Sequence, residues 1–149
     1  MNFPILSSLI LLPVIGSLFL LFSKDKNSNT GKYVALFTSF VNFLISVYLW
    51  YQFDPTTSDF QFVEDREWLK GFINYKVGID GISILFIVLT SLITPLCIIS
   101  VNNTVKDRLR DFLIAILVME SLMIGVFCSL DLVIFYLFFE AGLIPMFLI

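Results

Sequence analysis

Two glutamates are the residues of this sequence whose type and position could support chemistry. Glu120 lies in the apolar run ILVMESLMIG and Glu140 lies in FYLFFEAGLIPM, whereas the other charged residues fall in polar stretches or at the ends of apolar ones. A carboxylate in hydrocarbon costs about 3 kcal/mol on insertion scales and usually marks a functional site. Because such a group can gain or lose a proton as nearby charge changes, both residues are candidates for a proton relay.

The two carboxyl groups are expected at the same depth in a membrane. Glu120 precedes Leu130 by ten residues, and Glu140 follows it by ten. Ten residues of helix rise about 15 Å, which is half of the hydrocarbon thickness of roughly 30 Å. If two helices meet in a turn near Leu130, both acids lie near the midplane.

The sequence that follows Glu140 contains a helix break. Pro145 cannot donate to the carbonyl group of Ala141 four residues earlier, and Gly142 loosens the backbone between them. An unpaired carbonyl beside an acid can recruit water or a polar partner. This favours a functional role for Glu140. For Glu120, a proton relay and a neutral hydrogen bond between helices are both open.

The elements that carry these acids are those of a membrane protein. Hydrophobic residues make up 58% of the 149 and charged residues 14%, against about 25% charged in soluble domains. Five apolar stretches predict helices at about 3–22, 33–53, 81–101, 112–130 and 132–149, with a long outer loop at 54–80. The first four are long enough to span a bilayer. The prediction is therefore a single all-α integral membrane domain with about five transmembrane helices, part of a larger bundle.

Basic residues predict the orientation of these helices. They gather in the two short loops after the first and third stretches, at Lys24, Lys26, Lys32, Lys106, Arg108 and Arg110. Such loops mark the cytoplasmic or matrix side, so the N-terminus is expected outside. Met1–Phe3 carries no positive side chain, which argues against a signal peptide. The fifth stretch reaches Ile149 without a stop signal, so we expect the chain to continue.

The fourth stretch has a face of small residues. Ser121, Gly125 and Ser129 are spaced by four, a pattern that lets membrane helices approach closely. At 100° per residue this face lies on a different side of the helix from Glu120. With two surfaces that do not suit lipid, this helix is expected in the interior of the bundle.

The composition excludes several kinds of site. The sequence has no His, and its two cysteines, Cys97 and Cys128, lie in separate apolar stretches, where both are expected to be small buried hydrophobic residues. We therefore expect no metal site and no redox cofactor in this chain. The net charge of −3 and the scattered basic residues also argue against nucleic acid as a partner, which leaves the lipid bilayer and protons.

Three segments together are similar to a known family. They are YKVGIDGISILFIVLT, MESLMIGVFCSLDLVIFYLFFEAGLIPMFLI and the loop WYQFDP…FQFVEDREWL. They resemble the M subunit of respiratory complex I, called chain 4 in mitochondria, which is the proton-translocating membrane subunit of NADH:quinone oxidoreductase. The resemblance covers essentially the whole chain but only about the first third of the family's length.

The resemblance implies a role within an enzyme complex. Family members have fourteen membrane helices, and their key glutamate on the fifth helix matches Glu140, where it pairs with a lysine of a later helix. NADH, FMN, iron–sulfur clusters and quinone belong to other subunits, so the chain itself performs no redox chemistry. The implied partners are the other membrane subunits of complex I, in a bacterial inner (plasma) membrane or a mitochondrial inner membrane.

Two alternatives stay open. A subunit of a multi-subunit cation/proton antiporter shares the ancestral fold and the acid of the motif. A non-pumping structural chain would hold Glu120 and Glu140 as neutral hydrogen-bond partners. Co-purification with subunits that oxidise NADH, or its absence, distinguishes the complex I subunit from the antiporter subunit. Carboxyl groups that do not ionise between about pH 5 and 9 would support the structural chain.

Overall fold

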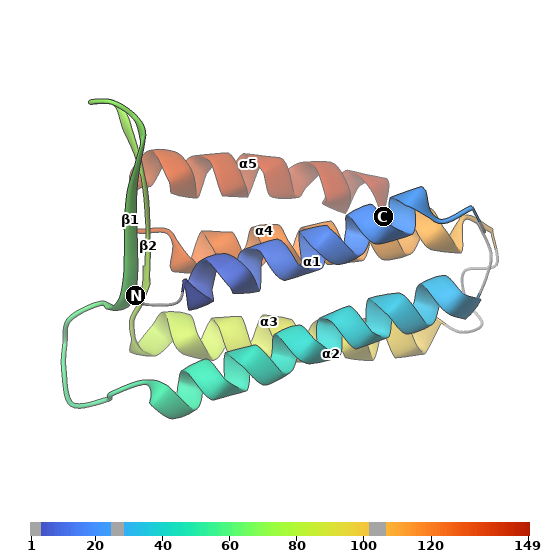
Figure 1. Cartoon of the computed structure of the whole chain (residues 1–149), viewed down its shortest axis with the longest axis horizontal. Helices are drawn as coiled ribbons and strands as arrows, with labels where there is room; N and C mark the ends of the chain where they lie inside the picture. Colours follow the sequence, from blue (N-terminus) through green and yellow to red (C-terminus); the bar gives the residue numbers. More distant parts are fainter. Residues whose placement is uncertain (1–3, 25–28, 102–106) are drawn as a thin grey trace.

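The computed structural model describes residues 4–24, 29–101 and 107–149, without the side chains of residues 68 and 69. Within them, five helices run side by side and a two-stranded antiparallel hairpin lies across one end of the bundle (Figure 1). The helices and strands are α1 (Ile5–Phe22), α2 (Asn29–Gln52), β1 (Gln61–Leu69), β2 (Ile73–Ile79), α3 (Gly81–Ser100), α4 (Leu109–Cys128) and α5 (Leu132–Leu148).

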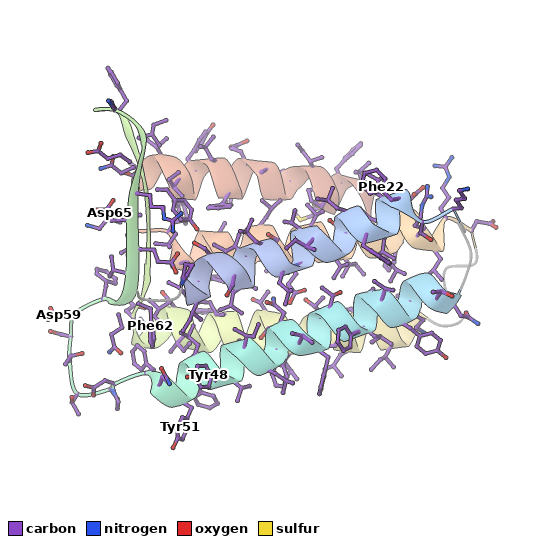
Figure 2. All side chains as sticks on the ribbon, viewed as in Figure 1. Phe22, Tyr48, Tyr51, Asp59, Phe62 and Asp65 are labelled. Atoms are coloured by element: carbon purple, nitrogen blue, oxygen red, sulfur yellow. The ribbon has the colours of Figure 1, made fainter. Side chains whose placement is uncertain are left out.

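Four helices of the described chain, α1 to α4, are long and apolar enough to cross a membrane, and α5 is an apolar helix of 17 residues. The predicted class, an integral membrane bundle of about five helices, is therefore confirmed. Large apolar side chains cover the outside of the bundle, where Phe22, Tyr48 and Tyr51 point away from it (Figure 2). This is the surface expected of helices surrounded by lipid.

The structure differs from the expected loop between the second and third helices. Residues 54–80 were expected to form a loop, but β1 and β2 pair there, in a register that places Asp65 opposite Lys76. Gly71 has φ of 86° in the turn between the strands, a conformation that glycine adopts without a steric cost. The hairpin is joined to the bundle by a main-chain hydrogen bond, in which Leu130 N donates to Lys76 O at 2.9 Å.

Two helices begin earlier than hydropathy indicated. α2 starts at Asn29 rather than at 33, and α4 starts at Leu109 rather than at 112. The first turn of a helix has free N–H groups that water can satisfy, so polar residues are tolerated there. Lys32 is therefore not a loop residue, as the sequence indicated, but a helical one, and only 7% of it is exposed.

The two basic connections do lie at the same end of the bundle. Arg110 Nη1 donates to Ser23 O at 3.0 Å, which joins the end of α1 to the start of α4. The hairpin, the start of α1 and the turn at Leu130 lie at the opposite end (Figure 1). Residues 26 and 106, part of the predicted basic set, lie outside the described residues. Which end faces the cytoplasm or matrix stays a prediction.

The helix α4 lies in the interior, as its small residues indicated. It packs against α1, α2, α3 and α5. A Cβ atom at Gly125 would lie 2.8 Å from the ring of Phe138 on α5, so the two helices pack closely because this residue has no side chain. Ser121, one turn earlier, donates from Oγ to Ile10 O of α1 at 2.5 Å. The small face of α4 therefore contacts two different helices.

A carboxylate from the hairpin caps the first helix. Pro4 provides no side-chain cap for α1, and Glu64 of β1 accepts hydrogen bonds from Leu6 N at 3.2 Å and from Ser7 Oγ instead. Tyr75 of β2 hydrogen-bonds Ser7 Oγ at 3.1 Å. Burial raises the pKa of Tyr75 by more than this hydrogen bond lowers it, so the hydroxyl stays protonated at neutral pH. A negative charge at this position also interacts favourably with the positive end of the helix dipole.

Replacing Glu64 by alanine is expected to lower the free energy of unfolding by about 1–2 kcal/mol, since the cap and the favourable dipole interaction are both lost. Thermal unfolding in lipid nanodiscs, followed by circular dichroism, measures the change. Glu67→Ala is the matched control, because Glu67 lies exposed on the same strand. Equal effects of the two substitutions would contradict the role of Glu64 as a cap.

Candidate proton-binding site

Glu120 lies inside the bundle and is paired with a residue that the sequence analysis missed. Asn42 of α2 donates from Nδ2 to Glu120 Oε1 at 3.0 Å. The Asn42 side chain is fully buried and Glu120 is 2% exposed. The amide oxygen Asn42 Oδ1 and the second carboxyl oxygen, Glu120 Oε2, are both buried without a hydrogen-bond partner among the described residues. A carboxyl group and an amide thus face each other in an apolar interior.

Hydroxyl groups extend this polar interior to α3. Ser46, one turn after Asn42, lies 2.7 Å from Ser91 of α3, measured between their Oγ atoms. Ser39, one turn before Asn42, is fully buried and donates to the carbonyl of Leu36 in its own helix. The signal was present in the sequence, because Ser39, Asn42 and Ser46 are spaced by three and four residues and so lie on one helical face.

Glu140 takes the opposite orientation. It lies in the middle of α5 but on an exposed face, and the described residues give it no hydrogen bond and no ion pair. The two candidate acids are thus on adjacent antiparallel helices, each ten residues from Leu130, but only Glu120 faces the bundle. Any group that exchanges a proton with Glu140 approaches from outside α1–α4.

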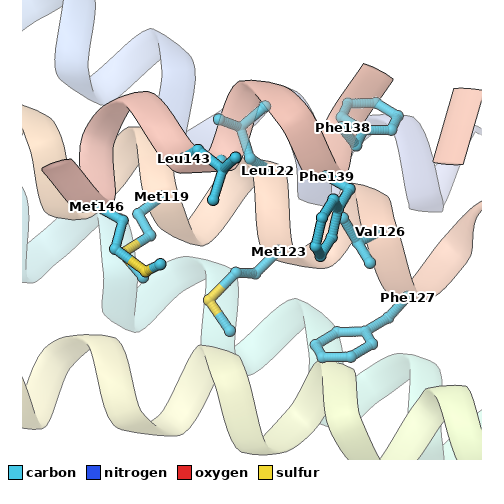
Figure 3. Close-up of a pocket in the computed structure, with 10 residues that line it drawn as sticks. Met119, Leu122, Met123, Val126, Phe127, Phe138, Phe139, Leu143 and Met146 are labelled. Carbon is cyan, nitrogen blue, oxygen red and sulfur yellow. The ribbon is translucent and has the colours of Figure 1, made fainter. Parts of the chain in front are cut away.

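The helix-break residues lie beside apolar grooves. Pro145 is buried, and α5 continues through it to Leu148. Gly142 lines a groove of about 240 Å³ between α4 and α5, together with Met119, Met123, Phe139 and Met146 (Figure 3). Ala141 and Pro145 line a second groove, which has α1 and α4 on its other sides. Pro145 has no N–H group to donate to the carbonyl of Ala141. That carbonyl therefore lies in a mainly apolar part of the surface.

The cysteines are placed differently from each other. Cys128 is buried at the end of α4, as expected of a small hydrophobic residue, but Cys97 is exposed on α3. The prediction for Cys97 was wrong because an apolar run on a membrane helix says nothing about which side faces lipid. Among the described residues, no three His, Cys, Asp or Glu side chains lie close enough to hold a metal ion.

No family model matches the chain, but curated proteins do. It is 46% identical to NADH-ubiquinone oxidoreductase chain 4 of Marchantia polymorpha, over 97% of this chain and 29% of that protein. It is 56% identical to NADH-quinone oxidoreductase subunit M of Rhodobacter capsulatus, over 84% of this chain and 23% of that protein. The chain is homologous to part of complex I subunit M. The subunit M of Rickettsia prowazekii is 42% identical over the full chain, which spans 31% of it.

This homology favours one of the interpretations of the sequence. The chain spans between 23% and 31% of the length of these three relatives, whose names favour the complex I subunit over the antiporter and the non-pumping structural alternatives. Relatives occur in mitochondria and in bacteria, and the apolar helices suit a bilayer. This homologue of subunit M is accordingly an integral protein of a bacterial or mitochondrial inner membrane.

Proposed function

We propose that this chain serves in the membrane arm of a proton-translocating NADH:quinone oxidoreductase. The observation that supports this most strongly is 42–56% identity, over nearly the whole chain, to relatives named as subunits of that enzyme. In this proposal the chain performs no redox chemistry. NADH, FMN, iron–sulfur clusters and quinone bind to other subunits, which are the chain's partners.

Within this function we assign the proton relay to Glu140. Its mid-helix position places the carboxyl group about 15 Å from the turn, near the middle of the hydrocarbon. Its exposed orientation leaves both carboxyl oxygens free for a group outside the bundle. When a positive charge approaches, the ionised form is favoured and a proton leaves; when the charge withdraws, the neutral form returns. A lysine of another helix is the proposed source of that charge.

Purification of the tagged protein from its host membrane tests the assignment to complex I. NADH oxidation coupled to quinone reduction is expected to co-purify with the tag, because the redox subunits are the proposed partners. The matched control is the untagged strain taken through the same procedure. Recovery with cation/proton antiporter subunits and without NADH oxidation would contradict the proposal and support the antiporter alternative.

A further inference from the structure

We propose that Glu120 and Asn42 form a binding site for one proton, held between a neutral carboxyl group and an amide. In this arrangement Asn42 Nδ2 donates to Glu120 Oε1, and the Glu120 carboxyl O–H donates from Oε2 to Asn42 Oδ1. The first of these hydrogen bonds is present at 3.0 Å. The second is the hydrogen bond that the proposal adds, between two buried oxygen atoms that otherwise have no partner among the described residues.

The unpartnered atoms carry this inference. Asn42 Oδ1 and Glu120 Oε2 are both acceptors when Glu120 is ionised, so neither can satisfy the other. Buried polar atoms without a partner are rare and costly. A proton on Glu120 turns one of the two acceptors into a donor, so a single hydrogen atom satisfies both.

The charges around the pair support a neutral carboxyl group. The described part of α1 carries no charged side chain, and the ion pair between Arg110 and Asp111 lies at the basic end of the bundle. Lys32 is ten residues before Asn42 on α2, about 15 Å along the axis. The remaining titratable side chains on the helices around Glu120 are the exposed Tyr33, Tyr48, Tyr51, Cys97, Tyr136 and Glu140, and the buried Cys128, two turns along α4.

A bound water molecule is the competing explanation. Water could donate one hydrogen to Asn42 Oδ1 and the other to Glu120 Oε2 while the carboxylate stays ionised. That arrangement leaves a buried negative charge without a counter-charge beside it, which low-dielectric surroundings disfavour. The proton removes the charge and also completes the hydrogen bonds.

Infrared difference spectroscopy of the protein in lipid nanodiscs tests the site. At neutral pH, wild type is expected to show a protonated-carboxyl band that shifts in D₂O and is lost in Glu120→Gln. In Asn42→Leu the band is expected to move to higher frequency, because the carbonyl loses its hydrogen bond from the amide. Glu140→Gln is the matched control, and it should leave the Glu120 band unchanged.

Two results would overturn the proposal. One is a wild-type spectrum identical to that of Glu120→Gln in the protonated-carboxyl region, which would mean an ionised Glu120 bridged by water. The other is a Glu120 band that stays at the same frequency in Asn42→Leu. If Asn42→Leu fails to fold, the Glu120→Gln comparison alone decides. The readout does not depend on NADH oxidation or pumping, so the site and the proposed function can fail separately.

Discussion

Replacing Glu140 by glutamine is expected to reduce NADH-driven proton pumping to background while the protein still assembles. Glutamine keeps the shape of glutamate but cannot ionise, so it cannot pass on a proton. The side chain is exposed and has no hydrogen bond among the described residues, so the bundle itself should be unaffected. Quenching of a pH-sensitive dye in inverted membrane vesicles, started by NADH, measures the pumping.

The matched control for this experiment is Glu120→Gln, which makes the same chemical change at the same depth on the adjacent helix. Glutamine at this position can exchange two hydrogen bonds with Asn42, as the proposed neutral glutamic acid does, so pumping is expected to persist. A Glu140→Gln protein that pumps like wild type would refute the relay assigned to Glu140.

Replacing Gly16 by alanine is expected to lower the free energy of unfolding by about 1–3 kcal/mol, the usual cost of an overpacked contact. A Cβ atom at Gly16 would lie 2.7 Å from Thr38 Cγ2 and 2.9 Å from Thr38 Oγ1. Thr38 cannot turn away freely, because its hydroxyl group donates to Val34 O at 2.8 Å. The contact between α1 and α2 must therefore open.

Gly142→Ala provides the comparison for this prediction, since no atom lies within 4 Å of a Cβ built at Gly142. There the substitution is expected to leave stability unchanged or to raise it by up to about 1 kcal/mol, because alanine favours the helix. Unfolding in mixed micelles, followed by helix content, measures both variants. Equal stability of the two variants would show that α1 and α2 tolerate a wider separation.

The helices were predictable because a bilayer requires long apolar stretches, and the distance of ten residues from Leu130 to each of Glu120 and Glu140 followed from counting. Whether each of these side chains faces the bundle or its surroundings was not predictable in the same way. The burial of Glu120 and the exposure of Glu140 depend on which helices pack against α4 and α5, and those contacts involve residues far apart in the sequence. Asn42 was missed for the same reason, although the spacing of Ser39, Asn42 and Ser46 marks a polar face of α2.

The hairpin was missed because β1 and β2 are too short to span a bilayer and mix apolar with charged residues, so the segment resembles a loop between two membrane helices. Lys32 was placed in a loop because hydropathy marks where a helix becomes apolar, not where its hydrogen bonds begin. Both errors concern segments between the long apolar stretches, where composition alone does not separate helix, strand and loop.

The attachment of the hairpin at two points has a mechanical consequence. Glu64 holds the start of α1, and Lys76 holds the turn that precedes α5. If α1 moved along its axis relative to α4, the hydrogen bonds of Glu64 to the start of α1 would break unless the hairpin moved as well. The axial position of these helices is thus tied to one hairpin, and a displacement of that hairpin would move α1 and the α4–α5 turn together.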